Sequence, residues 1–212
     1  MKQPAHRNAD GAGRSPAPFP LLALGMGAVA LLIASLPGAD TALVFDRGAL
    51  AAGEWWRLLT GHWVHWSANH LAWDVGTFVA LGAACEMRSR RRFAACVLGS
   101  GLAISAAVFF LLPELAQYAG LSGIDCALFA LLGAELWREQ RRADHRIAAV
   151  LAVALCVGLA LKVGFEWWTG GTVFVADLGA SIVPVPAAHV AGAAVGLAVP
   201  LAVAVAPRLR EL

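Results

Sequence analysis

Residues Phe93 to Leu112, FAACVLGSGLAISAAVFFLL, form an apolar segment without a charged side chain. A helix of about 20 apolar residues is long enough to cross the hydrocarbon core of a bilayer. Five further apolar segments of similar length lie before and after it, separated by shorter polar connections. The expected membrane helices are 19–36, 69–85, 93–112, 122–137, 147–168 and 187–206, with a polar leader at 1–18 and a tail at 207–212.

The composition predicts an all-α membrane protein, a six-helix bundle, and excludes an ordinary water-soluble domain. Hydrophobic residues make up 59% of the 212 residues and charged residues only 14%, whereas soluble domains carry about 25% charged residues. The net charge of +2 argues against a general nucleic-acid-binding surface. No cysteine pair has C-x-x-C spacing, so we expect buried, unreactive thiols at Cys85, Cys96, Cys126 and Cys156.

The positions of the basic residues predict the orientation in the membrane. All 16 Lys and Arg residues except Arg47, Arg57 and Lys162 fall in the leader, in the tail, or in the connections after the second and fourth expected helices. Because Lys and Arg collect on the cytoplasmic side of membrane proteins, both termini are expected in the cytoplasm. The connections expected on the opposite side are 37–68, 113–121 and 169–186.

The first apolar segment follows basic residues and is open to a second interpretation as the core of a signal peptide. It exceeds the usual length of about 7 to 15 residues, and no convincing small-x-small cleavage site follows it. We therefore expect a retained membrane helix.

Ionisable side chains inside membrane helices are costly, so each one is a functional candidate. Lys162 and Glu166 lie one helical turn apart, which predicts a structural ion pair. Glu135 lies one turn before the cytoplasmic arginines and is expected to extend towards them. The full set is His70, Asp74, Asp125, Glu135, Lys162, Glu166 and His189.

Ser122 lies between Gly120 and Gly123, where an outer connection becomes the expected helix 122–137. A serine before a helix is most often an N-cap. The functional alternative is a nucleophile whose oxyanion is stabilised by the free N–H groups at the start of the helix. The distance from Ser122 to Arg138 corresponds to about 24 Å of helix, which is shorter than the membrane core, so the serine is expected below the outer membrane surface.

A nucleophilic serine needs a base, and His70 and His189 are the histidines at the outer ends of the expected helices. Gly192 and Gly196 follow His189 with the small-x-x-x-small spacing that allows two helix backbones to approach closely. Packing of that face on helix 122–137 would bring His189 to Ser122.

Several separated motifs in the chain resemble the rhomboid intramembrane serine proteases over residues 50 to 200. These motifs are Trp55-Trp56-Arg57-Leu58-Leu59-Thr60, His65-Trp66-Ser67-Ala68-Asn69-His70, Leu81-Gly82 with Glu86, Gly120-Leu121-Ser122-Gly123, and His189 followed by Gly192 and Gly196. The compact size, Gly-Leu-Ser-Gly, and Leu161-Lys162 with Glu166 and Gly170 look most like the rhombosortase branch. Members of that branch are bacterial inner-membrane proteases that process proteins with a C-terminal Gly-Gly sorting tail.

The resemblance implies that Ser122 is the nucleophile and His189 the general base. It implies that the oxyanion is met by the Ser122 N–H, by His70, and by the residue four positions later, which is asparagine in the family and Asp74 here. A neutral Asp74 carboxyl would donate a hydrogen bond to the oxyanion, and burial favours that form. A second His-x-x-x-Asn register exists at His65 and Asn69, but His70 and Asp74 keep the family's spacing to Gly82 and Glu86.

The resemblance also implies roles beyond the reacting groups. Arg57, with Trp55 and Trp56, is expected to hold the first outer loop in place. No third residue that would orient His189 is visible in the sequence, so we expect a Ser-His dyad without a metal or cofactor. The substrates are expected to be membrane-anchored proteins with a C-terminal transmembrane tail, cleaved near the periplasmic face.

Two other function classes remain open on the sequence alone. The first is a non-catalytic rhomboid-like protein that binds or escorts transmembrane helices, and Asp74 in place of asparagine is its best support. The second is a haem- or metal-binding membrane protein that uses His62, His65, His70 and His189. Paired ligands on facing helices would be expected midway along the helices, whereas these histidines all lie at outer ends.

Overall fold

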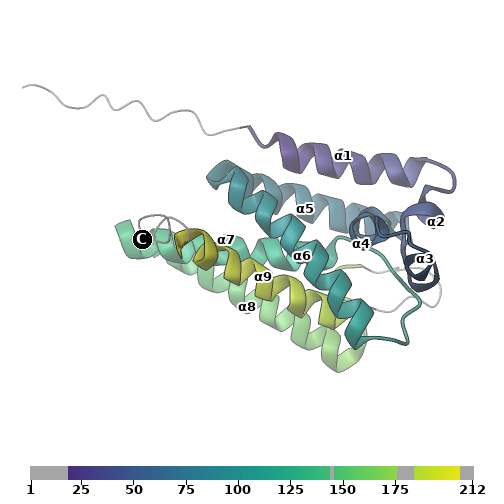
Figure 1. Cartoon of the computed structure of the whole chain (residues 1–212). Coiled ribbons are helices and arrows are strands. Elements are labelled where there is room, and N and C mark those ends of the chain that lie inside the picture. Colours follow the sequence, from purple (N-terminus) through teal and green to yellow (C-terminus); the bar gives the residue numbers. More distant parts are fainter. Residues whose placement is uncertain (1–18, 144–145, 176–183, 206–212) are drawn as a thin grey trace, which may run out of the picture.

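The computed structural model describes residues 19–143, 146–175 and 184–205. Each of the six expected apolar segments coincides with a long helix, and these helices run side by side (Figure 1). They are α1 (Leu21–Ser35), α5 (Ala68–Arg88), α6 (Arg90–Leu111), α7 (Ser122–Ala143), α8 (Arg146–Thr169) and α9 (Pro186–Val205). The expected leader and most of the expected tail lie outside the described residues.

Length and composition identify fewer membrane spans than the sequence analysis expects. Among the described residues, α6 and α8 are the 2 helices that are both long and apolar enough to cross a membrane. The helix α1 and the segment 186–202 are apolar but shorter. The helices α5 and α7 are long but carry the ionisable side chains noted above, which lower their hydropathy.

Several helices extend past their apolar segments. Helix α7 continues to Ala143 and α5 begins at Ala68 and continues to Arg88. Hydropathy marks only the apolar part of a helix, whereas Arg, Glu and Gln are good helix formers that let it continue into water. The Ser67 side chain accepts the N–H of His70 and so caps the start of α5.

The connection between α1 and α5 contains short elements of its own. These elements are α2 (Ala39–Leu43), β1 (Phe45–Asp46), α3 (Arg47–Ala51), α4 (Arg57–Thr60) and the 3-10 helix η1 (Gly61–Trp63). Strand β1 pairs in antiparallel fashion with β2 (Gln117–Tyr118), with Phe45 opposite Tyr118. This pair is an exception to the all-α expectation, because two-residue strands leave no periodic pattern in a sequence. It ties the connection between α1 and α5 to the segment that leads into Ser122.

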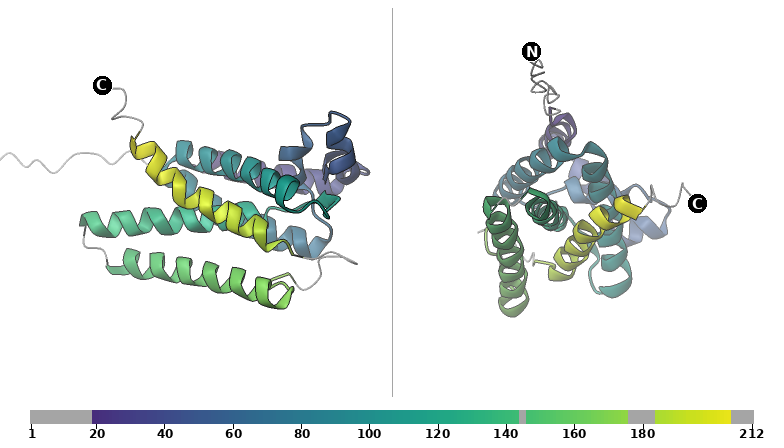
Figure 2. Two further views of the ribbon diagram at one scale, coloured as in Figure 1. Left: turned by 60° about the horizontal axis from the view of Figure 1, so that its bottom comes forward. Right: turned by 90° about the vertical axis from the view of Figure 1, so that its left-hand side faces the viewer.

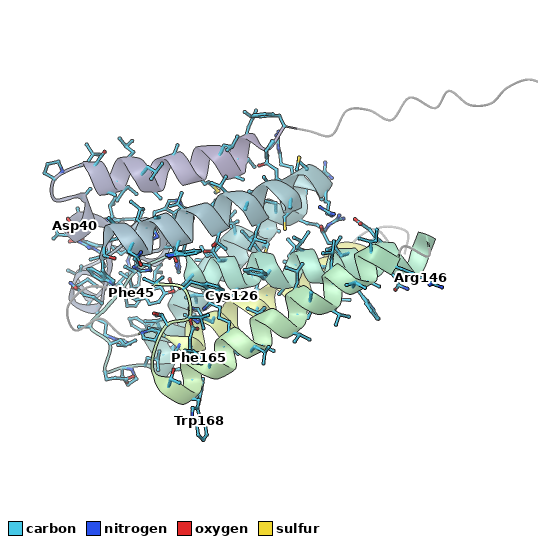
Figure 3. The ribbon with its side chains drawn as sticks, turned by 180° about the vertical axis from the view of Figure 1, so that it is seen from behind. Asp40, Phe45, Cys126, Arg146, Phe165 and Trp168 are labelled. Atoms are coloured by element: carbon cyan, nitrogen blue, oxygen red, sulfur yellow. The ribbon has the colours of Figure 1, made fainter. Side chains whose placement is uncertain are left out.

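Helix α7 lies at the centre of the bundle, where it contacts α5, α6, α8 and α9. Helix α9 lies across α6 and α7, and α8 is at the edge (Figure 2). Many apolar side chains of α8 point away from the bundle, as Trp168 does with 90% of its surface exposed (Figure 3), whereas Ala152 is buried against the core. Cys156, on the same helix, is exposed rather than buried as expected. Its Sγ lies beside Gly133 of α7, which has no side chain to cover it. The other three cysteines are buried.

Two buried charged residues, one at each end of α1, hold parts of the fold together. Arg57 donates to the backbone carbonyls of Thr41 (2.9 Å) and Val44 (2.8 Å), and so fastens the connection between α1 and α5. Glu86 accepts the N–H groups of Leu22 and Ala23, at 3.2 Å and 2.9 Å. These N–H groups begin α1 and have no partner within that helix, so the Glu86 carboxylate joins α1 to α5.

Candidate active site

Ser122 is the first residue of α7 and follows a sharp turn at Gly120. Gly120 has a φ of 114°, a conformation that side chains rarely allow, and a Cβ there would lie 2.8 Å from His70 Nε2. Glycine at this position therefore permits both the turn and the close approach of His70 to the serine.

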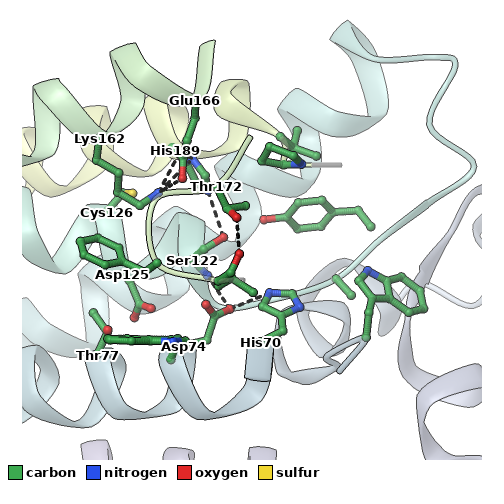
Figure 4. Close-up of a pocket in the computed structure, with 18 of the residues that line it drawn as sticks. His70, Asp74, Thr77, Ser122, Asp125, Cys126, Lys162, Glu166, Thr172 and His189 are labelled. Atoms are coloured by element: carbon green, nitrogen blue, oxygen red, sulfur yellow. Dashed lines mark hydrogen bonds and ion pairs between the residues drawn. The ribbon is translucent and has the colours of Figure 1, made fainter. Parts of the chain in front are cut away.

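His189, in the first turn of α9, reaches Ser122 across the α7–α9 interface. Its Nε2 lies 3.0 Å from Ser122 Oγ, and the histidine is 4% exposed (Figure 4). A Cβ on Gly192 would overlap the carbonyl of Gly123, and one on Gly196 would overlap the carbonyl of Ala127. Only glycine lets α9 approach α7 this closely, and the close approach brings the two side chains within hydrogen-bond distance.

The second ring nitrogen of His189 has a partner that the sequence analysis did not identify. His189 Nδ1 lies 2.8 Å from Glu166 Oε2. The Lys162–Glu166 ion pair expected from the sequence is present, with Lys162 Nζ 2.8 Å from each carboxylate oxygen. Lys162 Nζ is 3.5 Å from His189 Nδ1. The sequence signal for this contact was an ionisable residue, Glu166, near the end of an apolar helix.

Asp74 reaches the backbone at the start of α7 from the opposite side of Ser122 (Figure 4). Its Oδ2 accepts the N–H groups of Leu121 (2.9 Å) and Ser122 (3.1 Å) and lies 3.1 Å from His70 Nε2. The expected role was the reverse, a neutral carboxyl that donates to an oxyanion. Backbone N–H groups can only donate, so Oδ2 is an acceptor here and lies where two backbone N–H groups and the His70 ring converge.

The alternative register at His65 and Asn69 does not occupy the same place. Asn69 is exposed, whereas Asp74 is buried against the start of α7. His65 packs beside this group, with its Nε2 3.3 Å from Asp74 Oδ2. The structure thus brings His70 and Asp74, rather than Asn69, next to Ser122.

The four histidines considered as metal ligands do not form one cluster in the described part of the chain. His65, His70 and Asp74 each offer one possible ligand atom, and these atoms lie within 4.8 Å of one another. His62 is elsewhere, on η1, where its Nε2 lies 2.9 Å from the Gly101 carbonyl of α6. Burial lowers the pKa of His62 to about 4, so this ring stays neutral and acts as a structural link.

A cavity of about 300 Å³ opens beside the serine. Both Ser122 and His189 line it, together with His70, Asp74, Lys162 and Glu166, and its remaining wall is largely aromatic and aliphatic. Asp125 also lines the cavity, and its Oδ1 has no hydrogen-bond partner among the described residues. A half-buried serine and a buried histidine beside a cavity are able to carry out acyl transfer on a substrate segment that enters it.

Two comparisons with known proteins agree with the motifs in the sequence. Residues 52–205 match the family model described as "Rhomboid domain". The chain is also 38% identical over 93 residues to rhomboid protease GluP of Bacillus subtilis (strain 168), an alignment that covers 43% of this chain. It covers only 17% of that relative's length. Because the family model spans well over half of the chain, the protein belongs to the rhomboid family.

Proposed function

We propose that the protein is an intramembrane serine endopeptidase in which Ser122 is the nucleophile and His189 the general base. The observation that carries this proposal is the 3.0 Å distance between Ser122 Oγ and His189 Nε2 beside a cavity. Membership of the rhomboid family and similarity to a relative named as a protease support proteolysis as the reaction.

The two side chains account for both proton transfers of peptide hydrolysis. Ser122 Oγ attacks the carbonyl carbon of the scissile bond while its proton passes to His189 Nε2. The same proton is then given to the leaving amine nitrogen as the C–N bond breaks, which leaves an acyl-enzyme ester. A water molecule then attacks the ester carbonyl carbon and loses a proton to His189 Nε2. His189 gives this proton to Ser122 Oγ as the ester C–O bond breaks, which restores the free serine and the neutral histidine. The product carboxylic acid loses its own proton to water.

The oxyanion of the tetrahedral intermediate would take the place of Asp74 Oδ2. Donors already converge there, namely the N–H groups of Leu121 and Ser122 and, from α5, the His70 ring. Oriented donors of this kind stabilise developing negative charge. In this proposal, Asp74 aligns the donors in the resting enzyme and moves aside when the substrate carbonyl enters.

The proposed setting is a six-span arrangement in a bacterial inner membrane, with both termini in the cytoplasm. The distribution of basic residues supports this orientation, and the apolar outer faces of α1 and α8 support contact with lipid. The active site would then open towards the periplasm, near the outer end of a substrate helix.

The proposed substrates are proteins held in the membrane by a C-terminal helix that follows a Gly-Gly sorting tail. This narrower proposal rests on the resemblance to the rhombosortase branch. Co-expression with a Gly-Gly-tailed candidate, followed by mapping of its new C-terminus, tests it. A new C-terminus that forms with the wild type and not with Ser122→Ala supports the assignment, and cleavage that is indifferent to the Gly-Gly tail contradicts it.

Labelling with a fluorophosphonate probe in detergent or lipid tests the proposed chemistry directly. The wild-type protein should be labelled, and both Ser122→Ala and His189→Ala should lose the label. Cys126→Ser is a suitable control because it changes another side chain that lines the cavity and is expected to keep the label. Absence of labelling in a folded wild-type preparation would instead support a non-catalytic protein that binds transmembrane helices.

A further inference from the structure

Helix α8 contributes a carboxylate to the serine–histidine pair, although the pair was expected to have no third member. Glu166 is 2% exposed and His189 is 4% exposed. Glu166 Oε2 is 2.8 Å from His189 Nδ1, while His189 Nε2 faces Ser122 Oγ at 3.0 Å (Figure 4). The three side chains thus form a continuous line from α8 through α9 to α7.

The two distances around Nδ1 decide where the imidazole proton lies. A nitrogen and an oxygen at 2.8 Å need a proton between them, since two lone pairs would repel each other. Lys162 lies 2.8 Å from both oxygens of Glu166 and favours its ionised form, so the proton belongs to Nδ1. A neutral imidazole has one N–H, which leaves the Nε2 lone pair free to accept the proton of Ser122.

Lys162 could in principle contact His189 Nδ1 in place of Glu166, but the distance between Lys162 Nζ and Nδ1 argues against this arrangement. If the Lys162 ammonium donated to Nδ1, the ring proton would lie on Nε2 and the histidine could not act as a base. The separation of Lys162 Nζ from Nδ1 is 3.5 Å, compared with 2.8 Å for Glu166. Hydrogen bonds weaken steeply over this range, so the carboxylate determines the tautomer.

We infer that Glu166 is a positioning residue that holds His189 in the tautomer and orientation of a general base. This inference rests on the proposed function. During acylation the proton of Ser122 moves to Nε2, and the resulting imidazolium is stabilised by the adjacent carboxylate. Lys162 keeps that carboxylate ionised and fixed between two partners.

The competing explanation is that Lys162 and Glu166 form a structural pair that merely touches His189. A double variant separates the two explanations. Lys162→Met/Glu166→Leu leaves no unpaired charge inside the protein, and such replacements are often neutral for stability. A purely structural pair predicts a folded protein that fluorophosphonate labels at about the wild-type rate. A positioning role predicts a folded protein whose labelling is slower by about 100-fold or more.

The matched control is the ion pair of Arg92 and Glu135, which joins α6 to the end of α7 that is distant from Ser122. Glu135 is 5% exposed at its side chain and lies 2.5 Å from Arg92 Nε, and neither residue lines the cavity. Arg92→Met/Glu135→Leu should therefore keep the wild-type labelling rate. Glu166→Asp, which retains the carboxylate, should recover part of the rate lost in the double variant.

Nitrogen-15 NMR of histidine-labelled protein provides a readout independent of activity. The His189 signals, assigned by their loss in His189→Gln, should show the proton on Nδ1 in the wild type and lose this preference in Lys162→Met/Glu166→Leu. A wild-type proton on Nε2, or a double variant labelled within about threefold of the wild type, would overturn the inference. If the wild type is not labelled at all, the proposed function fails, and the NMR result still decides whether Glu166 sets the tautomer.

Discussion

Asp74 Oδ2 accepts a hydrogen bond from the backbone N–H of Ser122 at 3.1 Å. In the proposed mechanism, this side-chain oxygen fills the position of the oxyanion. The N–H of Leu121 reaches the same oxygen at 2.9 Å. The carboxylate thereby satisfies N–H groups that a helix start leaves without partners. It also places negative charge beside Ser122, the proposed nucleophile, where the charge would oppose formation of an oxyanion.

Fluorophosphonate should label Asp74→Asn at least as fast as the wild type, and we expect the labelling rate to rise by about threefold to tenfold. The amide has nearly the same shape but carries no charge to repel the developing oxyanion. The measurement is the second-order labelling rate at fixed pH in one detergent.

The matched control is Asp125→Asn, which changes a second carboxylate of the same cavity. No backbone N–H at the start of α7 donates to Asp125 among the contacts of the described residues, so its effect should be smaller. A loss of labelling in Asp74→Asn of about 100-fold would show that the carboxylate is required in its present position.

Gly192→Ala should reduce both labelling and stability. The added methyl would overlap the carbonyl of Gly123, so α9 has to move away from α7 and carry His189 with it. Overpacking of this kind costs about 1–3 kcal/mol of unfolding free energy. The thermal unfolding midpoint in detergent and the labelling rate should fall together.

Gly158→Ala is the control for the glycine substitution, because a Cβ on Gly158 meets no atom within 4 Å. This variant should unfold at the wild-type temperature or slightly above it, since alanine favours helix more than glycine does. An unchanged labelling rate in Gly192→Ala would mean that α9 does not need its close contact with α7.

Glu86→Ala should destabilise the fold without a direct effect on the serine. The fully buried carboxylate accepts two N–H groups of α1 and pairs with Arg90 at 2.9 Å. Removal of the carboxylate leaves the buried N–H of Ala23 without its acceptor, which costs about 1–3 kcal/mol. The reference variant is Glu139→Ala, whose pair with Arg88 is exposed and worth at most about 1 kcal/mol. Equal unfolding midpoints for the two variants would contradict the role of Glu86.

His62 should make the stability of the fold depend on pH. Its pKa is about 4 in the folded protein because burial disfavours the charged ring, and about 6.5 in the unfolded chain. Between these pH values the unfolded chain therefore binds more protons than the folded protein. The contribution of His62 to the free energy of unfolding is fully present above pH 6.5 and is lost as the pH drops towards 4. The loss should approach about 3 kcal/mol.

The comparison for this pH dependence is His62→Gln, which is able to donate to the Gly101 carbonyl in place of Nε2 but does not titrate. The unfolding free energies of the two proteins, measured from pH 7 to pH 4, should diverge on acidification. Parallel curves would show that the ring is not buried in solution as it is in the structure.

Much of the helical framework could be predicted from hydropathy alone. The apolar segments coincide with α1, α5, α6, α7, α8 and α9. Each of these helices contains a continuous run of apolar residues, and such a run is visible directly in the sequence. The helix ends were less predictable, since Arg and Glu continue a helix as readily as apolar residues do. The strand pair of Phe45 with Tyr118 was not predictable, because its two strands are far apart in the chain.

By itself, the sequence determined which residues were candidates for chemistry. Ser122 and His189 stand out as polar side chains at helix starts. The spacing of Gly192 and Gly196 predicts a close contact between helices. The distance between the serine and the histidine, the contact of Glu166 with His189, and the acceptor role of Asp74 were decided only by the tertiary structure. Each contact depends on how the separate helices are rotated and how closely they pack. The strength of a hydrogen bond changes over tenths of an ångström, and the spacing of residues along a sequence does not define distances that finely.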